Sequence, residues 1–327
     1  MDPGLQPSAS ESDNGTPVVP AADPSRNPDI PAAPATRSPI DGAAPVAEPD
    51  DAEQIKAPPE PWTTERFFAT IAERLGPHYV VVRDASFCWL TPFGDRHAAH
   101  ARQGHYGLRR LPELIPGLEP HPPPGGWPAI LFAGTDDQLS YNGFFPGAGT
   151  NIISGGVWRT WPVGHLAIPV RRETNLDAAF VHELVHAVLA GSGIPRWIQE
   201  GIATGVETAM GAKRSPLSDL YAWRQTLAYW RGRDPALFWS GRAFSDPDSS
   251  AHAYRLAQVL GRHWTRSAER LHQMRALGRK GWQDQDAALT AIIGADRAAI
   301  LAAVLDERSR RGIVERFLHW MFVGDQV

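Results

Sequence analysis

The chain has 327 residues, a net charge of −4 and a single cysteine, Cys88. This length allows one enlarged domain or two subdomains, and one cysteine excludes both an intrachain disulfide and a zinc site built from cysteines. No apolar run approaches the ~18 residues that a membrane-spanning helix needs. We therefore expect no membrane span, and we expect Cys88 to be a small buried residue between Phe87 and Trp89.

Residues 1–60 differ in composition from the rest of the chain. They are rich in Ala, Pro, Ser and Asp, contain no aromatic residue, and hold eleven acidic residues against three basic ones. Such a segment cannot bury enough apolar surface to offset the entropy of ordering it, so we predict a disordered tail. Three minus eleven gives this tail a charge of −8, which leaves about +4 for the remainder. That excess is too diffuse to indicate nucleic-acid binding, and basic and aromatic residues are not interleaved.

The first residues, MDPGLQPSASESD, lack the charged start and the apolar core of a signal peptide. We therefore expect a cytoplasmic protein, whereas a translation start further upstream would make an exported protein the expectation. The tail is interpreted as a flexible linker or as a consequence of where the gene start is assigned.

From Trp62 onward the sequence has the patterns of regular secondary structure. Residues 63–76 (TTERFFATIAERLG) predict a helix that is capped by Thr63 and ends at a Gly-Pro pair. Residues 97–111 are ambiguous, and residues 111–127 are predicted to form a proline-rich loop. Strands are expected at 78–83, 128–134, 150–158 and 165–170, and a short helix at 135–144.

After residue 210 the sequence is almost entirely helical in pattern. The expected helices are 216–232, 249–264, 284–294, 295–312 and 314–322. A mixed part followed by helices predicts an α+β fold rather than a doubly wound sheet. We expect a small mixed sheet and a buried helix in residues 61–209, and a mainly helical C-terminal subdomain in residues 210–327. A cleft between two such subdomains is a common place for a binding site.

The segment AFVHELVHAVL, residues 179–189, holds two histidines and a glutamate within little more than one helical turn. Thr174 and Asp177 resemble a capping box, and Gly191 can close the far end. An apolar stripe runs along the same segment. These features predict a largely buried helix, whose polar residues need partners.

The polar residues of this helix have the spacing of a metal site. Side chains four residues apart differ by about 40° in direction, so His182 and His186 can meet one ion. Glu183 points about 100° away and can reach a water bound to that ion, as in a His-Glu-x-x-His zinc hydrolase. A catalytic zinc usually has three protein ligands and an open position for water. Glu200 is the best third candidate, because a turn at Pro195 can return a second helix to the first.

HELVHAVL followed by PRWIQEGIATGVE resembles the gluzincin metallopeptidases. The closest resemblance is to the peptidase MA-like family, in which HExxH precedes a Pro-x-Trp-x-x-Glu-Gly-x-Ala phrase, and it covers residues 174–207. It implies a zincin-like fold, with one Zn²⁺ ion bound by His182, His186 and Glu200. It also implies that Glu183 is the general base.

A weaker match lies downstream, where FWSGRAF (238–244) and AHAYRLAQVLGRHW (251–264) resemble a later helix of the same family. The resemblance implies that Tyr254 faces the site and donates a hydrogen bond to the oxyanion of the tetrahedral intermediate. An equally good interpretation places Tyr254 in the core, on a stripe that it shares with Ala257.

Several other polar residues have both a functional and a structural interpretation. We interpret Glu207 as a surface glutamate rather than as a partner that holds a ligand histidine. The histidines His97, His100 and His105 are interpreted as solvated rather than as a second metal cluster. His252 is likewise expected to be solvated.

Residues 165–170 (HLAIPV) are the candidate sheet edge on which a peptide could bind as an added antiparallel strand, with His165 at its start. Some of the 12 tryptophans could border an aromatic groove, although a place in the core is the favoured interpretation. These are Trp158, Trp161, Trp223, Trp230 and Trp239.

Together these features predict a zinc-dependent metallopeptidase that acts on a peptide or protein substrate. Cleavage of internal bonds or of chain ends stays open, as does the oligomeric state. One alternative is a zinc-binding protein that holds a peptide or partner in the same groove without cleaving it, but the presence of Glu183 favours the enzyme. A second alternative is a helical interaction protein without a metal.

Overall fold

The structure is a computed structural model. It describes residues 61–145, 155–170, 176–211, 219–261, 267–279 and 285–305. All of these residues belong to one unit of the chain, Asp51–Val327. The tail predicted at residues 1–60 and the helix predicted at 314–322 lie outside the described residues. Within the described ranges, no single helix combines the length and the apolar composition needed to cross a membrane.

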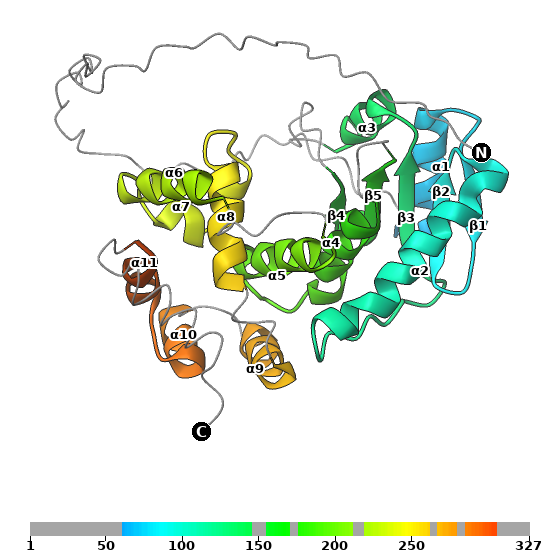
Figure 1. The fold of residues 1–327 in the computed structure, drawn as a ribbon. Coiled ribbons are helices and arrows are strands. Elements are labelled where there is room, and N and C mark those ends of the chain that lie inside the picture. The colour runs from blue at the N-terminus through cyan, green and yellow to red at the C-terminus, as the bar shows by residue number, and fades with distance from the viewer. Residues whose placement is uncertain are drawn as a thin grey trace, which may run out of the picture. The chain divides into compact units, whose positions relative to one another are not determined.

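A five-stranded mixed sheet lies at the centre of the N-terminal half (Figure 1). Its strands are β1 (Val80–Arg83), β2 (Phe87–Thr91), β3 (Trp127–Phe132), β4 (Val157–Arg159) and β5 (His165–Pro169). The order in the sheet is β1-β2-β3-β5-β4. The three inner strands are parallel, and each edge strand is antiparallel to its neighbour. All four predicted strands are present in this sheet, although residues 150–154 lie outside the described residues.

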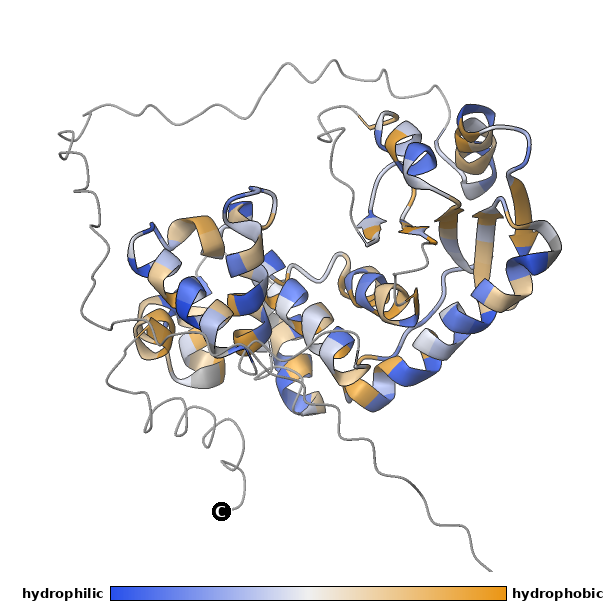
Figure 2. Ribbon diagram, turned by 45° about the horizontal axis from the view of Figure 1, so that its top comes forward, coloured by the Kyte–Doolittle hydropathy of each residue, from blue (hydrophilic) through white to orange (hydrophobic). Residues whose placement is uncertain are grey.

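Helices cover both faces of the sheet, so the inner strands are apolar on both faces. The helices are α1 (Thr64–Leu75), α2 (His97–Leu114), α3 (Thr135–Asn142) and α4 (Leu176–Leu189). Phe87 and Trp89 belong to the same buried cluster as residues of α2 and α4. The alternate residues Cys88 and Leu90 belong to the cluster formed with α1 and α3, so the predicted burial of Cys88 is confirmed. Figure 2 shows the strands as largely hydrophobic, whereas the surrounding helices mix hydrophobic and hydrophilic residues.

The first two helices test two local predictions. Thr63 caps α1, because its Oγ1 accepts a hydrogen bond from the backbone N–H of Arg66 at 3.2 Å. The ambiguous segment 97–111 forms most of α2, which continues to Leu114. The loop predicted at 111–127 was therefore wrong for its first four residues, and also for Trp127, which begins β3. Pro112 lies in the last turn, so the distortion that a proline causes falls where α2 ends three residues later at the Ile115 cap.

The remaining elements are mainly helical, which together with the mixed sheet confirms the predicted α+β class. They are α5 (Arg196–Ala209), α6 (Leu220–Arg231), α7 (Ala236–Trp239), α8 (Ser250–Gly261), α9 (Ala268–Arg279), α10 (Gln285–Ile293) and α11 (Arg297–Leu305). Four of the expected helices correspond to α6, α8, α10 and α11. The boundary near residue 210 between two subdomains stays a prediction.

Helices α5 and α8 cross at two glycines. A Cβ atom on Gly201 would lie 2.3 Å from the carbonyl oxygen of Ala257, and one on Gly261 would lie 2.2 Å from the carbonyl carbon of Gly201. Both separations are far below van der Waals contact, so neither position has room for a side chain. Gly201 follows Glu200 directly, and this crossing therefore fixes the part of α5 that carries the third candidate ligand.

We expect Gly201→Ala to destabilise the protein by at least about 1–3 kcal/mol, because the added methyl group forces two backbones apart. Gly205→Ala is the matched control on the same helix, since its Cβ would meet nothing within 4 Å. This control should be stabilised by about 0.5–1 kcal/mol, because alanine favours a helix interior. Urea unfolding measures both values, and equal stabilities for the two variants would contradict the packing described for the crossing.

Candidate metal centre

Helix α4 holds the two motif histidines beside its apolar stripe. Phe180 and Leu184 are fully buried in the core against the sheet. His182 and His186 lie one turn apart, and their side chains are 12% and 14% exposed. Their Nε2 atoms are 3.3 Å apart. The two imidazoles therefore converge, as the spacing of four residues predicts.

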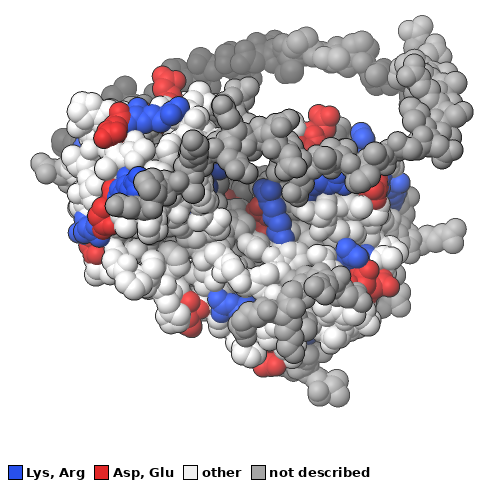
Figure 3. Space-filling model, turned by 180° about the vertical axis from the view of Figure 1, so that it is seen from behind, with Lys and Arg blue, Asp and Glu red and all other residues white. Residues whose placement is uncertain are grey.

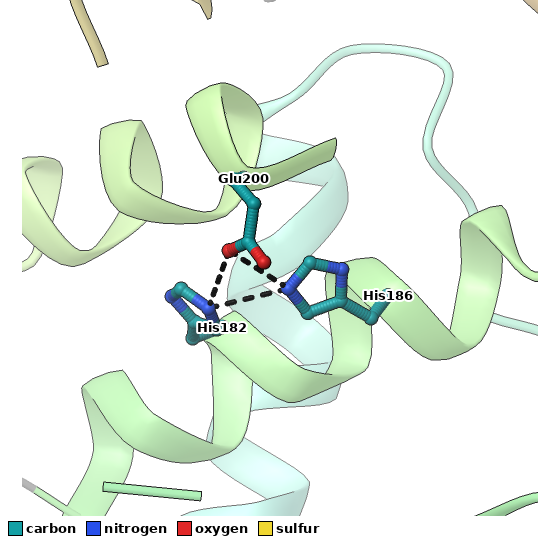
Figure 4. A group of neighbouring side chains, drawn as sticks. All are labelled: His182, His186 and Glu200. Atoms are coloured by element: carbon teal, nitrogen blue, oxygen red, sulfur yellow. Dashed lines mark hydrogen bonds and ion pairs between the residues drawn. The ribbon is translucent and has the colours of Figure 1, made fainter. Parts of the chain in front are cut away.

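Helix α5 brings Glu200 to the same point (Figure 4). The chain leaves α4 through Gly191, which has a positive φ of 70°, and Pro195 precedes the first residue of α5. Glu200 Oε2 lies 3.5 Å from His182 Nε2 and 3.4 Å from His186 Nε2. Within the described part of the chain, these residues form the only group of three or more His, Cys, Asp or Glu side chains able to share one ion, with ligand atoms within 4.8 Å of one another.

The donor set of this group fits a divalent metal such as zinc. Two imidazole nitrogens and one carboxylate oxygen are ligands that zinc accepts. Glu200 is 4% exposed, and its Oε2 makes no hydrogen bond of normal geometry to the described residues. A buried carboxylate oxygen without such a bond is costly, and a cation between the three ligand atoms would remove that cost. The triad therefore has the chemistry and the convergence of a metal site.

Without a cation, the three side chains balance charge among themselves. Burial disfavours the imidazolium, but the adjacent carboxylates of Glu200 and Glu207, at 3.5 and 3.3 Å, outweigh it and raise the pKa of His182 to about 10. Burial also disfavours the charged form of Glu200, but the two histidines outweigh it and hold the pKa of Glu200 well below its usual range. Because a metal binds neutral imidazole, a metal at this triad would displace the proton of His182.

Glu183 lies beside the triad and outside it. Its side chain faces the segment that enters β4: a Cβ atom on Gly156 would lie 3.1 Å from Glu183 Oε1, and the Trp158 backbone donates a hydrogen bond to the carboxylate. Glu183 is 6% exposed. Burial raises its pKa, although His182 and His186 oppose that shift. The carboxylate is therefore fixed between the edge strand and the histidines.

Tyr254 is on α8 and is partly buried against the main core. Its ring lies edge-on to Phe244, with centroids 5.2 Å apart. Burial, followed by the charges of Glu200 and Glu183, raises the pKa of Tyr254. Tyr254 thus packs as a core aromatic, and a role facing the metal site stays a prediction.

The surface behind the view of Figure 1 is hollowed near its middle. In Figure 3 acidic and basic side chains lie together inside this hollow. Most of the other charged side chains on this face are spread around its periphery.

The interpretation of Glu207 as a surface residue was wrong. Its side chain is 12% exposed, and its Oε2 lies 3.3 Å from Nδ1 of His182. Glu207 follows Glu200 by seven residues, so two helical turns place both on the same face of α5. The sequence signal was this spacing of seven within a helix already expected to return to α4.

The prediction that His97, His100 and His105 are solvated was wrong for His97, and the other two are partly buried. His97 is 7% exposed and packs edge-on to Trp89, with ring centroids 5.1 Å apart. His105 Nε2 lies 3.2 Å from Asp84 Oδ2. His100 is partly buried and contacts Phe93. The reason is that this segment is a helix whose inner face covers the sheet.

Residues 165–170 were expected to form an edge of the sheet, but they form an inner strand. β5 pairs with both β3 and β4, so it is an inner strand, and β4 is the sheet edge nearest Glu183. His165 lines no cleft, because it is fully buried and bonded to the Tyr141 hydroxyl at 2.5 Å and the Val163 carbonyl at 2.7 Å. Five consecutive buried residues in β5 fit an inner strand better than an edge.

The five candidate tryptophans differ in burial, and His252 contacts other side chains. Trp223, Trp230 and Trp239 are buried, as favoured, Trp158 is partly buried, and Trp161 is 45% exposed. His252 is not simply solvated. Its ring stacks on Tyr229 with centroids 4.4 Å apart, and its Nδ1 lies 3.1 Å from the Thr226 hydroxyl.

No family model matches this chain. No curated protein and no solved structure shows significant similarity to it. The function is therefore argued from the residues of the triad and their surroundings.

Proposed function

We propose that the protein is a zinc-dependent metallopeptidase of zincin-like fold, similar to the gluzincin family that its motif resembles. The observation that carries the proposal is the convergence of His182, His186 and Glu200 on one point. The three come from two helices, and the buried carboxylate of Glu183 lies next to them. Under the proposal the three converging residues hold one Zn²⁺ ion, and Glu183 stays free for proton transfer.

Bound zinc would supply a Lewis acid that polarises the scissile carbonyl and makes a water molecule more acidic. Glu183 takes a proton from the attacking water and later delivers it to the leaving amine. Its place in α4 suits this role, because it points about 100° away from the neighbouring His182. Its contacts with Gly156 and the Trp158 backbone hold the carboxylate in one orientation.

The substrate class proposed is an extended peptide or protein segment. β1 and β4 are the two edge strands of the described sheet. β4 is the edge beside the site, because the backbone at Trp158 contacts Glu183. A peptide added antiparallel to this edge would run past the carboxylate that handles the proton. This replaces residues 165–170 as the proposed peptide-binding edge.

Tyr254 is proposed to donate a hydrogen bond to the oxyanion. We expect Tyr254→Phe to lower kcat by about 100-fold, the effect of losing one oxyanion donor, while zinc content and KM stay close to wild type. The hydroxyl is the only group removed, so the packing on Phe244 remains. An unchanged kcat would assign Tyr254 to the core alone.

The test of the function combines metal analysis with cleavage assays. The protein is purified without chelator, its zinc content is measured by elemental analysis, and it is incubated with a broad peptide library. The expected result is about one zinc per chain, as the single triad implies, with cleavage that is lost on chelation and restored by added zinc.

Two results would replace the proposal. Bound zinc without cleavage of any peptide would favour a protein that binds a peptide or partner in the same groove without cleaving it. Zinc content near zero, with no binding of added zinc, would favour an interaction protein without a metal.

A further inference from the structure

We infer that helix α5 holds all three ligand side chains in place, through Arg196 for Glu200, Gln199 for His186 and Glu207 for His182. This inference rests on the proposed zinc site. Arg196, Gln199 and Glu207 each contact one ligand side chain. In each case the contacted atom is the one on the side of the ligand away from the triad. Each contact thereby leaves the converging atom of that ligand free for the metal. The three are positioning residues, because none of them offers an atom to the shared point.

The two oxygens of the Glu200 carboxylate have different partners, and Arg196 binds one of them. Its Nε lies 3.2 Å from Glu200 Oε1 and donates a hydrogen bond to it, whereas Oε2 faces the two histidines. A guanidinium bonded to one oxygen keeps the carboxylate from rotating. The contact therefore selects Oε2 as the ligand atom.

The surroundings of Arg196 fix its own position. Its Nη1 donates to the Ser245 hydroxyl at 3.0 Å, and its guanidinium lies 5.6 Å from the ring centroid of Phe244. Gly241 makes room for the stem of the side chain, since a Cβ atom there would lie 3.2 Å from Arg196 Cβ. A side chain held at both its stem and its head can orient Glu200, although it is 47% exposed.

Gln199 selects the tautomer of His186. Its Nε2 donates to the Ile194 carbonyl at 2.7 Å, which turns the amide so that Oε1 faces His186 Nδ1 at 3.4 Å. An amide oxygen can only accept, so a neutral His186 bonded to it carries its proton on Nδ1 and keeps the lone pair of Nε2 for the metal. Nε2 is the nitrogen that faces Glu200 and His182.

Glu207 has the same effect on the other histidine. Its Oε2 lies 3.3 Å from His182 Nδ1, on the opposite side of the ring from Glu200. The pair has ion-pair distance without full hydrogen-bond geometry, and a carboxylate on this side of the ring favours the proton on Nδ1 and leaves Nε2 for the metal. Arg196, Glu200 and Glu207 project within about 40° of one another on α5, and Gln199 lies about 60–100° from them, towards the other histidine. One helix therefore carries a partner for every ligand.

The inference is tested by zinc affinity rather than by activity, because Arg196 also contacts Tyr254. The variants are Arg196→Met, Gln199→Met and Glu207→Met, which keep an unbranched side chain that suits a helix. Their zinc dissociation constants are measured by competition with a chromogenic chelator. Each variant should bind zinc about 10–100-fold more weakly than wild type, the usual effect of removing such a partner.

Two control variants carry the same chemical change away from the site. Arg83 pairs with Glu65, which joins β1 to α1 on the far side of the sheet from α4, and Glu113 pairs with Arg110 on the outside of α2. Arg83→Met and Glu113→Met should keep wild-type zinc affinity. Thermal unfolding of the metal-free proteins shows which variants fold. Glu207→Gln and Arg196→Lys, which keep an acceptor oxygen or the charge, should lose less affinity than the methionine variants and replace any that fails to fold.

The outcomes separate this inference from the proposed function. If wild type binds zinc and all three folded methionine variants bind it as tightly, the positioning role is overturned and the zinc site stands. If wild type itself binds no zinc, the proposed metal site is wrong and the positioning role falls with it.

Discussion

Glu183→Gln is expected to abolish peptide cleavage while leaving zinc bound. Removal of a general base costs about 10²–10⁴-fold in rate, and the amide cannot take a proton from water. Because Glu183 lies outside the triad, the three ligand side chains are untouched and the zinc dissociation constant should stay within about twofold of wild type. The measurements are kcat on a cleaved library peptide and the zinc content of the purified variant.

Folding is the main concern for this variant, because Glu183 is buried against β4. Glutamine has nearly the same shape and can still accept the hydrogen bond from the Trp158 backbone, so thermal unfolding should be close to wild type. Glu113→Gln, on the outer side of α2, is the control that should change neither quantity. Loss of zinc together with activity would mean that Glu183 is a ligand rather than a base, and full activity would exclude it from the chemistry.

Glu200→Ala is expected to remove zinc from the protein. The substitution deletes the one carboxylate of the triad and leaves only the two imidazoles. Loss of a residue that merely positions a ligand costs about 10–100-fold in metal affinity, so loss of the ligand itself should cost more than about 100-fold. Chelator competition measures the dissociation constant, and peptide cleavage should be lost at the zinc concentrations that saturate wild type.

Glu207→Gln is the matched variant that separates loss of a metal ligand from loss of a nearby carboxylate. Both glutamates are nearly buried on the same face of α5 and contact His182. If the position of the carboxylate decides its role, then Glu200→Ala weakens zinc binding far more than Glu207→Gln does. A Glu200→Ala variant that keeps wild-type zinc affinity would rule out the third ligand.

Local patterns predicted much of the fold. The cap at Thr63, the apolar runs of the predicted strands and the convergence of His182 and His186 all depend on residues within one element. The geometry of a helix or strand sets the direction of each side chain, so period and spacing are enough. The turn at Pro195 extended this reasoning to Glu200, because a short connection limits the positions that the second helix can take relative to the first.

The tertiary structure decided what depends on contacts between elements distant in the chain. The edge role of β4, the burial of His97 and the contact of Glu207 with His182 follow from which surfaces meet. So does the close crossing of α5 and α8 at Gly201, which a glycine in the sequence only permits. The sequence by itself thus determined the directions of the site residues within their helices. Only the packing of those helices on the sheet and on one another decided which residues are buried together. Burial requires two surfaces in contact, whereas a local sequence pattern describes only one of those surfaces.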